Sequence, residues 1–508
     1  MVEKRVFDML GVDNWLESSM ERPPHPSIYK KIKKTEKMIK DGEEPKTFVD
    51  KGGLDIETYK NLKKRNDIYN ESIDKMNLKL HSAAEKGLDI NQLIGVRLPC
   101  EKSDKVTGTR RALVLPVDFK DHKNQTTAEY FQDMLFKKGS NSLRDYYLEA
   151  SWNQLDIIGD VSEWFTAKNA ENLYLDKLPA KNPDTGGIYF PNAQKLVAEA
   201  VQNAVKGDID LSKYDYNGDG IIDMLIVIYA GVGFDTAHDI NFITPHTGYL
   251  NDPIIIKKGK KEYQINKYSI IPELSSGNLK PVDLGCFCHE IAHVLGIPEL
   301  YHLDFSSKTP EFAPVMGDWC LMGVGSFVNN GANPTHMGAW CKIKLGWTEP
   351  EVVTGKSENY DIPVVIDPAK KIYKLEVPKS NGKEYFLLEN REQKGFDKYI
   401  SADGLLIWHV DENKCVGDFP NSDKKHYFLS VVQADGKREL EATKNFKEPS
   451  INGDAGDVYP GTSNNRSLDD TTTPNSKSYT KKPSGITIKS ISDPGDKMTA
   501  IMGVKGAK

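Results

Sequence analysis

The chain has 508 residues, 28% of them charged, and its formal net charge at pH 7 is -6. This length exceeds the size at which a single hydrophobic core usually stops growing, so we expect two or three domains. The charge balance leaves no global basic field, which argues against a nucleic-acid partner bound through its phosphates. The longest apolar run, at 224–233, is too short to cross a bilayer, so we expect no membrane span.

The first 104 residues differ in composition from the rest of the chain. Stretches at 30–44 and 57–87 are rich in Lys and Glu and favour helix. We predict a mostly helical N-terminal region at 1–104, which is either a solvated arm or a pro-segment packed on the next domain. Its start lacks the uninterrupted apolar core of a secretory signal peptide and leaves the location of the protein open.

Residues 105–348 alternate predicted strands and helices. A β-type run at 110–121 indicates a strand, and the segments at 126–136 and 192–205 indicate helices. The apolar run at 224–230 indicates a buried strand. This mixture predicts an α+β domain built on a mixed sheet.

Residues 349–508 consist of short apolar or alternating runs that are broken by Gly, Asn, Asp and Pro. Such spacing of strands and turns is typical of an all-β unit, so we predict a C-terminal domain that resembles a β-sandwich. The runs lie at 371–378, 384–392, 404–412, 426–435, 485–493 and 497–504.

The stretch "DLGCFCHEIAHVLG" at 283–296 carries the clearest chemistry in the chain. On a helix, His293 lies about 40° around the axis from His289, and Glu290 lies about 100° away. Neutral imidazoles suit Zn²⁺, and a catalytic zinc site has three protein ligands and a water. We predict that the two histidines bind zinc and that Glu290 is the general base. The plainer interpretation is a helix with two structural histidines.

The ends of this helix suggest where a third ligand comes from. Asp283 is suited to cap the N-terminus, and Gly296 is suited to stop the helix. A turn at Gly296 lets a later side chain swing back toward the imidazoles. Glu299 stands six residues after the second histidine and is the first choice. Asp304 and His302 are the alternatives.

A second ligand-rich segment, "DYNGDGIID" at 215–223, alternates oxygen-bearing side chains around two glycines. Its candidate calcium ligands are Asp215, Asn217, Asp219 and Asp223. A turn without an ion is the alternative. The segments at 409–413 and 452–457 could form another cation site, with surface turns as the default.

Six cysteines are too few to make a disulfide scaffold in a chain of this length. Cys286 and Cys288 stand close to His289, but helical phase places Cys288 on the opposite side of His289 from Glu290. We therefore interpret both as small buried residues rather than metal ligands. Cys100, which precedes the α+β domain, could occupy the open zinc position as a thiolate.

In these motifs the chain resembles the immune inhibitor A family of secreted bacterial metallopeptidases, a metzincin-related group. Where the family usually has Asp in a Gly-Leu-Pro-Asp-Leu-Tyr phrase, this chain has Glu299 within "GIPELY". The resemblance spans roughly 110–508 and is carried by further segments at 113–121, 142–165, 316–327, 334–347, 385–399, 404–412 and 453–462.

The resemblance implies a metzincin-like zinc domain at 105–348 and an extracellular location. It also implies that Met322 is the methionine of the turn beneath the metal, with Met316 as the alternative. Tyr301 and His336 are hypotheses for the group that stabilises an oxyanion.

The sequence therefore predicts a zinc-dependent endopeptidase that acts on protein or peptide substrates and carries zinc and calcium. Two alternatives differ in activity. One is a secreted adhesion or surface-binding protein with a structural or decayed zinc site, although a structural site has no need of Glu290. The other is a metal-dependent exopeptidase.

Overall fold

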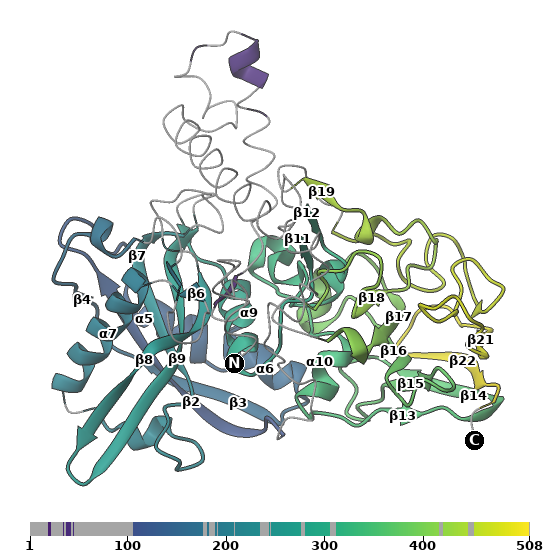
Figure 1. Ribbon diagram of the computed structural model, residues 1–508, viewed down its shortest axis with the longest axis horizontal. Helices are drawn as coiled ribbons and strands as arrows, with labels where there is room; N and C mark the ends of the chain where they lie inside the picture. Colours follow the sequence, from purple (N-terminus) through teal and green to yellow (C-terminus); the bar gives the residue numbers. More distant parts are fainter. Residues whose placement is uncertain are drawn as a thin grey trace, which may run out of the picture.

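The structure is a computed structural model of the chain. Figure 1 shows the α+β part and the C-terminal strands side by side along the long axis. Most of the predicted helical N-terminal region lies outside the described residues, which include a strand, β1 (Ser19–Glu21), and helical backbone at 37–40. The described residues are 19–21, 34, 37–41, 44, 105–175, 180–181, 188–189, 191–207, 209–233, 243, 245–275, 280–304, 311–415, 420–445 and 452–506.

The α+β part is built on one mixed sheet with the strand order β1-β8-β9-β7-β2-β3. Strands β3, β2, β7 and β9 are parallel neighbours, whereas β8 is antiparallel to β9 and β1 is antiparallel to β8. Short strands β4 and β10 pair with β2 and β9. The bounds are β2 Gly108–Asp118, β3 Leu155–Val161, β4 Phe165–Thr166, β7 Leu225–Val232, β8 His246–Lys258, β9 Lys261–Ser275 and β10 Lys280–Pro281.

Helices cover both faces of this sheet because its central strands are apolar on both sides. In β2, Val114 joins one core cluster and Leu113 joins the other. The first cluster includes side chains of α5, α6 and α9, and the second includes those of α7. The sheet is therefore the middle of three layers. The helices are α5 Ala128–Phe136, α6 Leu143–Ala150, α7 Pro191–Lys206, α9 Leu284–Val294 and α10 Ala339–Lys344.

The C-terminal strands form two further sheets, in the orders β13-β15-β16-β17-β18 and β14-β22-β21-β20. Phe386 of β16 and Ile488 of β21 lie in one shared apolar cluster, so the sheets pack on each other. Leu387 faces the other way, into the α+β core, which explains why β16 is buried throughout. The bounds are β13 Glu351–Val352, β14 Gly355–Pro363, β15 Tyr373–Glu376, β16 Glu384–Arg391, β17 Gly404–Asp411, β18 Leu429–Val431, β20 Leu468–Asp469, β21 Ile486–Lys489 and β22 Lys497–Val504.

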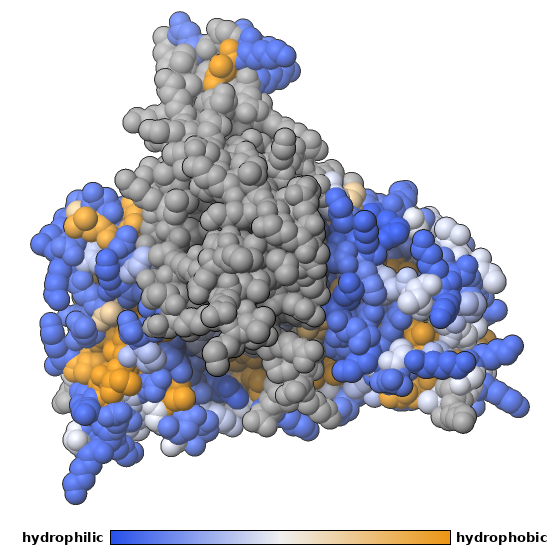
Figure 2. All heavy atoms as spheres, in the orientation of Figure 1, coloured by the Kyte–Doolittle hydropathy of each residue, from blue (hydrophilic) through white to orange (hydrophobic). Residues whose placement is uncertain are grey.

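The boundaries of the three predicted domains stay a prediction. No helix among the described residues is long and apolar enough to span a membrane. The coloured surface visible in Figure 2 is mostly hydrophilic, with apolar side chains in small separate groups. The remaining strands are β5 Ala180–Lys181, β6 Ile188–Tyr189, β11 His302–Asp304, β12 Glu311–Ala313 and β19 Lys444–Asn445.

Candidate active site

Helix α9 begins and ends at the two residues that the sequence suggests. The side chain of Asp283 accepts a backbone N–H in the first turn. Gly296 has a φ of +96°, a conformation that L side chains rarely adopt. The N–H of Gly296 donates to His293 O at 3.0 Å, and the N–H of Ile297 donates to Ala292 O at 3.1 Å. This pair of bonds is the Schellman arrangement, which reverses the chain after the helix.

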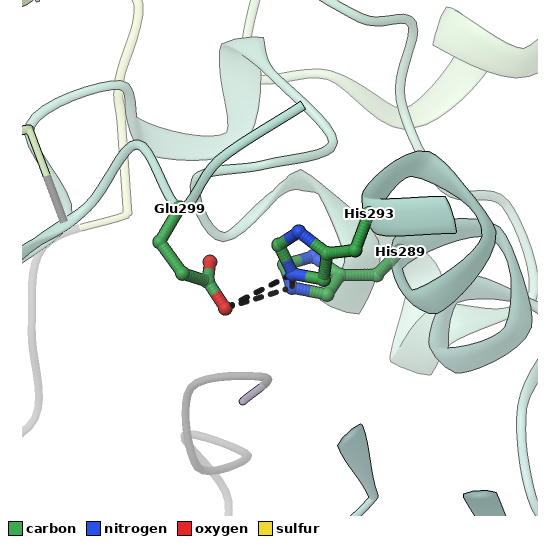
Figure 3. Close-up of side chains that lie close together, drawn as sticks. All are labelled: His289, His293 and Glu299. Carbon is green, nitrogen blue, oxygen red and sulfur yellow. Dashed lines mark hydrogen bonds and ion pairs between the residues drawn. The ribbon is translucent and has the colours of Figure 1, made fainter. Parts of the chain in front are cut away.

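The reversal brings Glu299 opposite the two histidines of α9, as Figure 3 shows. Glu299 Oε1 lies 3.3 Å from His289 Nε2 and 3.2 Å from His293 Nε2, and the two Nε2 atoms are 3.1 Å apart. All three side chains are fully buried. Ligands at about 2.0–2.1 Å from a tetrahedral zinc are separated by about 3.3 Å, so these donors fit zinc.

Backbone carbonyls orient both imidazole rings. His289 Nδ1 lies 3.3 Å from Leu321 O, and His293 Nδ1 lies 2.7 Å from Ile297 O. A carbonyl only accepts hydrogen bonds, so each Nδ1 carries the proton that it donates. When neutral, each ring directs its Nε2 lone pair toward Glu299, which is the arrangement that a metal-binding histidine needs.

The electrostatics of the group favour a positive charge among the donors. Burial opposes ionisation of Glu299, but the charges of His289 and His293 outweigh it and lower the Glu299 pKa. Burial also disfavours the charged form of His293, yet the Glu299 carboxylate raises the pKa of His293 overall. A buried carboxylate facing two imidazoles is thus suited to hold a cation.

Two side chains of the sheet contact this helix without any signal in the local sequence. Thr247 Oγ1, on β8, lies 3.0 Å from Glu290 Oε2. Lys267 Nζ, on β9, donates to His293 O at 3.0 Å and to Val294 O at 3.1 Å, which satisfies carbonyls at the helix end. Glu290 itself is fully buried. The sequence could not identify either partner because both are more than 25 residues away.

The alternative third ligands lie elsewhere or outside the described side chains. His302 is on β11, and its Nδ1 lies 2.8 Å from Asn421 O. The backbone of Asp304 ends the same strand, but its side chain is outside the described part. Among the described residues, the potential metal donors that meet here are His289 and His293 of α9 and Glu299, which follows the helix.

The two residues suggested for oxyanion stabilisation are both buried. The Tyr301 ring packs beside Phe312 with a centroid separation of 5.5 Å. His336 Nε2 lies 2.9 Å from Glu149 Oε1, and Lys342 Nζ lies 3.2 Å from its Nδ1. His336 therefore lies between two charged side chains, the partly buried Glu149 and the buried Lys342.

The two methionines near the site are fully buried. The Met322 carbonyl accepts a hydrogen bond from Leu300 N at 3.1 Å, which joins this turn to the segment that carries Glu299. The preceding residue, Leu321, supplies the carbonyl for His289. Met316 lies close to Gly323, the residue that follows Met322.

The segment at 215–223 does not gather its carboxylates. Asn217 Nδ2 donates to Asp219 Oδ2 at 2.8 Å. Among the described residues, no group of three His, Cys, Asp or Glu donors within 4.8 Å includes this segment. Instead, each carboxylate accepts a backbone N–H of its own loop: Asp215 from Gly220 at 3.0 Å, Asp219 from Ile221 at 2.7 Å and Asp223 from Tyr216 at 2.5 Å.

The two segments considered for a second cation site, 409–413 and 452–457, have separate partners. Asp411 Oδ2 lies 2.8 Å from His426 Nε2, so the segment at 409–413 makes its own ion pair. Asp454 instead groups with Asp435 and Glu439, with donor atoms within 4.8 Å of one another.

The cysteines near α9 fill space in the core. Cys286 and Cys288 are fully buried within the first apolar cluster, together with Phe287 and Ile291. Cys100 lies outside the described residues, so its predicted contact with the metal stays a prediction.

The α+β part of the chain is similar to known proteins. The family model described as immune inhibitor A peptidase M6, catalytic domain, matches residues 102–348. Immune inhibitor A of Bacillus thuringiensis subsp. alesti is 26% identical over 275 residues, which cover 44% of this chain and 38% of that protein. The match thus spans well under two thirds of that relative. Residues 102–348 are therefore similar to the catalytic domain of the immune inhibitor A-like metallopeptidases.

Proposed function

We propose that this chain is a zinc-dependent endopeptidase that hydrolyses peptide bonds in proteins or peptides. The observation that carries the proposal is the convergence of three buried donor atoms within 3.1–3.3 Å. His289, His293 and Glu299 would hold the zinc. When bound, zinc supplies the positive charge that polarises a peptide carbonyl and makes a water molecule acidic.

The two carboxylates near the histidines have different roles in this mechanism. Glu299 faces both imidazoles and would be a ligand. Glu290 follows His289 on α9 but points about 100° around the helix, toward the position of an attacking water. It would take the proton of that water and pass it to the leaving amine. Met322 would pack beneath the site and support the ligand-bearing turn.

The alternative adhesion or surface-binding role fits the group less well. Structural zinc sites usually have four protein ligands, whereas catalytic sites have three and leave one position for water. Among the described residues, three side chains form the group. A buried glutamate beside such a set supports catalysis, because a structural site needs no general base.

Digestion of an unstructured protein substrate tests the proposal. Glu290→Ala should lose activity by about 10²- to 10⁴-fold while it retains zinc, because only the general base is removed. Removal of zinc with a chelator should abolish cleavage. Glu129→Ala, an exposed glutamate on α5, is the matched control and should cleave at the wild-type rate. Cleavage by Glu290→Ala at that rate would refute the mechanism.

A substrate with both termini blocked separates the two enzymatic alternatives. An endopeptidase should cut internal bonds of the blocked peptide as fast as those of the open one. An exopeptidase needs a free terminus, so it should leave the blocked peptide intact. Internal cleavage products identified by mass spectrometry decide between them.

We further propose that the N-terminal region is a pro-segment. Strand β1 pairs with β8 in the register Met20 to Thr247, and it also lies against α9. An extended peptide commonly binds by adding a strand to a sheet edge, so β1 would occupy a place that substrate could use. Met20→Pro removes a backbone N–H and should raise activity, whereas Met20→Ala should not. Equal activity of the two variants would contradict a blocking role for β1.

Calcium and secretion remain part of the proposal. The alternating oxygen ligands at 215–223 support a calcium-stabilised turn, because Ca²⁺ prefers carboxylate and carbonyl oxygens. The family resemblance supports an extracellular location. Detection of the protein in the culture medium of its source organism, with a cytoplasmic marker as control, would test that location.

A further inference from the structure

The side chain of Thr247 connects strand β8 to the carboxylate of Glu290. Thr247 Oγ1 lies 3.0 Å from Glu290 Oε2, 2.9 Å from the Glu290 main-chain oxygen and 2.8 Å from Ser269 Oγ. Thr247 and Ser269 are direct cross-strand partners of β8 and β9, and both side chains are buried. Glu290 is therefore held by the sheet as well as by its own helix.

The hydroxyl groups can satisfy these contacts in one direction only. A threonine hydroxyl has one proton to donate and two lone pairs to accept with. With its carboxylate ionised, as a general base requires, Glu290 offers only acceptors, so Thr247 shares its single proton between Oε2 and the main-chain oxygen of Glu290. Ser269 in turn donates to Thr247 Oγ1. Successive hydrogen bonds of this kind polarise and strengthen one another.

This connection acts on the carboxylate end of Glu290. The terminal torsion of a glutamate is broad and roughly two-fold. Threonine is branched at Cβ, which restricts its χ1 torsion. The backbone of Thr247 is also fixed, because β8 pairs with β9 at this position. A general base must lie within hydrogen-bond reach of the proton it takes, so its carboxylate plane has to be fixed.

We propose that Thr247 is a positioning residue that orients the Glu290 carboxylate, and that Ser269 fixes the direction of the Thr247 hydroxyl. This inference rests on the proposed role of Glu290 as general base. Thr247 acts through Glu290 and does not take part in the chemistry itself.

Three single substitutions test the proposal by steady-state kinetics on a peptide substrate. Thr247→Val keeps the shape and strand preference but removes the hydroxyl, so kcat should fall about 10- to 100-fold. KM should stay within about twofold, because substrate binding is untouched. Thr247→Ser retains the hydroxyl and should recover most of kcat. Ser269→Ala should reduce kcat less than Thr247→Val does.

The same variants need two controls. Zinc content and the melting temperature should match the wild type, which separates orientation from unfolding. In a Glu290→Gln background, Thr247→Val should cause no further loss of kcat, because the base that it orients is already gone. An additional loss there would show that Thr247 acts independently of Glu290 and would overturn the proposal.

The failures of the two proposals are distinguishable. If wild-type cleavage does not depend on Glu290, the proposed function fails first. If cleavage depends on Glu290 but Thr247→Val keeps the wild-type kcat, the positioning role is overturned. Should Thr247→Val lose zinc or unfold, Ser269→Ala decides, because an unchanged kcat in that variant contradicts the hydroxyl chain.

Discussion

At residues 289–299 the donor atoms of two histidines and one glutamate lie 3.1–3.3 Å apart, all on buried side chains. At residues 215–223 the carboxylates point to backbone N–H groups of their own loop instead. Both segments have metal-binding residue types at regular spacing. The spacing alone therefore does not determine whether the donors meet.

The backbone around each segment explains the difference. At the first site, the carbonyls of Leu321 and Ile297 accept from the Nδ1 atoms, so the Nε2 atoms remain directed at Glu299. At the second, a backbone N–H occupies one oxygen of each carboxylate. Main-chain acceptors thus prepare a histidine site, whereas main-chain donors compete with a carboxylate site.

The largest test of this contrast is the removal of Glu299. Glu299→Ala should lose stoichiometric zinc and lower peptide hydrolysis by at least about 10²-fold, because two buried imidazoles alone make a weak site. Glu299→Asp keeps the charge but shortens the reach by one methylene, so zinc affinity should fall less. Elemental analysis after gel filtration, with a parallel activity assay, measures both effects. Retention of one zinc per chain by Glu299→Ala would exclude Glu299 as a ligand.

A smaller test concerns the turn that delivers Glu299. Gly296→Ala meets no atom within 4 Å, so its cost is the strain of a φ of +96°, about 1–2 kcal/mol. Gly139 is the matched control, since it has a φ of +83°, also meets nothing within 4 Å and lies in an exposed turn. Both alanine variants should lose similar stability in thermal unfolding.

Only one of these variants should weaken zinc binding. The Gly296 turn positions the Ile297 carbonyl for His293 Nδ1, so Gly296→Ala should lower zinc affinity by about tenfold. Gly139→Ala should bind zinc like the wild type in a competition assay with a chromogenic chelator. If both variants lost zinc affinity equally, general destabilisation rather than ligand delivery would be responsible.

Helix α9 could be predicted from the sequence because the information that specifies it is local. The histidine spacing, the Asp283 cap and the Gly296 stop all act within one helix and its two ends. The central strands were accessible for a similar reason, since residues buried on both faces form continuous apolar runs. Strand β2 at Gly108–Asp118 and strand β7 at Leu225–Val232 match the runs from which they were predicted.

Contacts between distant segments were not accessible in this way. Thr247 and Lys267 reach α9 only because β8 and β9 pair with each other beside it. Similarly, the grouping of Asp454 with Asp435 and Glu439 has no signal in the local sequence, because it joins two distant segments. A single sequence specifies strands better than their order in space, and these side chains depend on that order.

The smallest expected effect is that of calcium on the loop at 215–223. Asp223 is partly buried, and burial raises its pKa above the usual aspartate value. Without an ion, its favourable contribution is present at low pH and is lost as pH rises through that raised pKa. A bound Ca²⁺ favours the ionised carboxylate, so calcium should stabilise the protein at pH 7 and have little effect at pH 4. We expect millimolar Ca²⁺ to raise the melting temperature by about 2–4 °C.

Asp223→Asn should remove this increase, whereas Asp133→Asn, on α5, should retain it. An equal increase in both variants would place the calcium outside the loop, because the acidic group around Asp435 would then be sufficient.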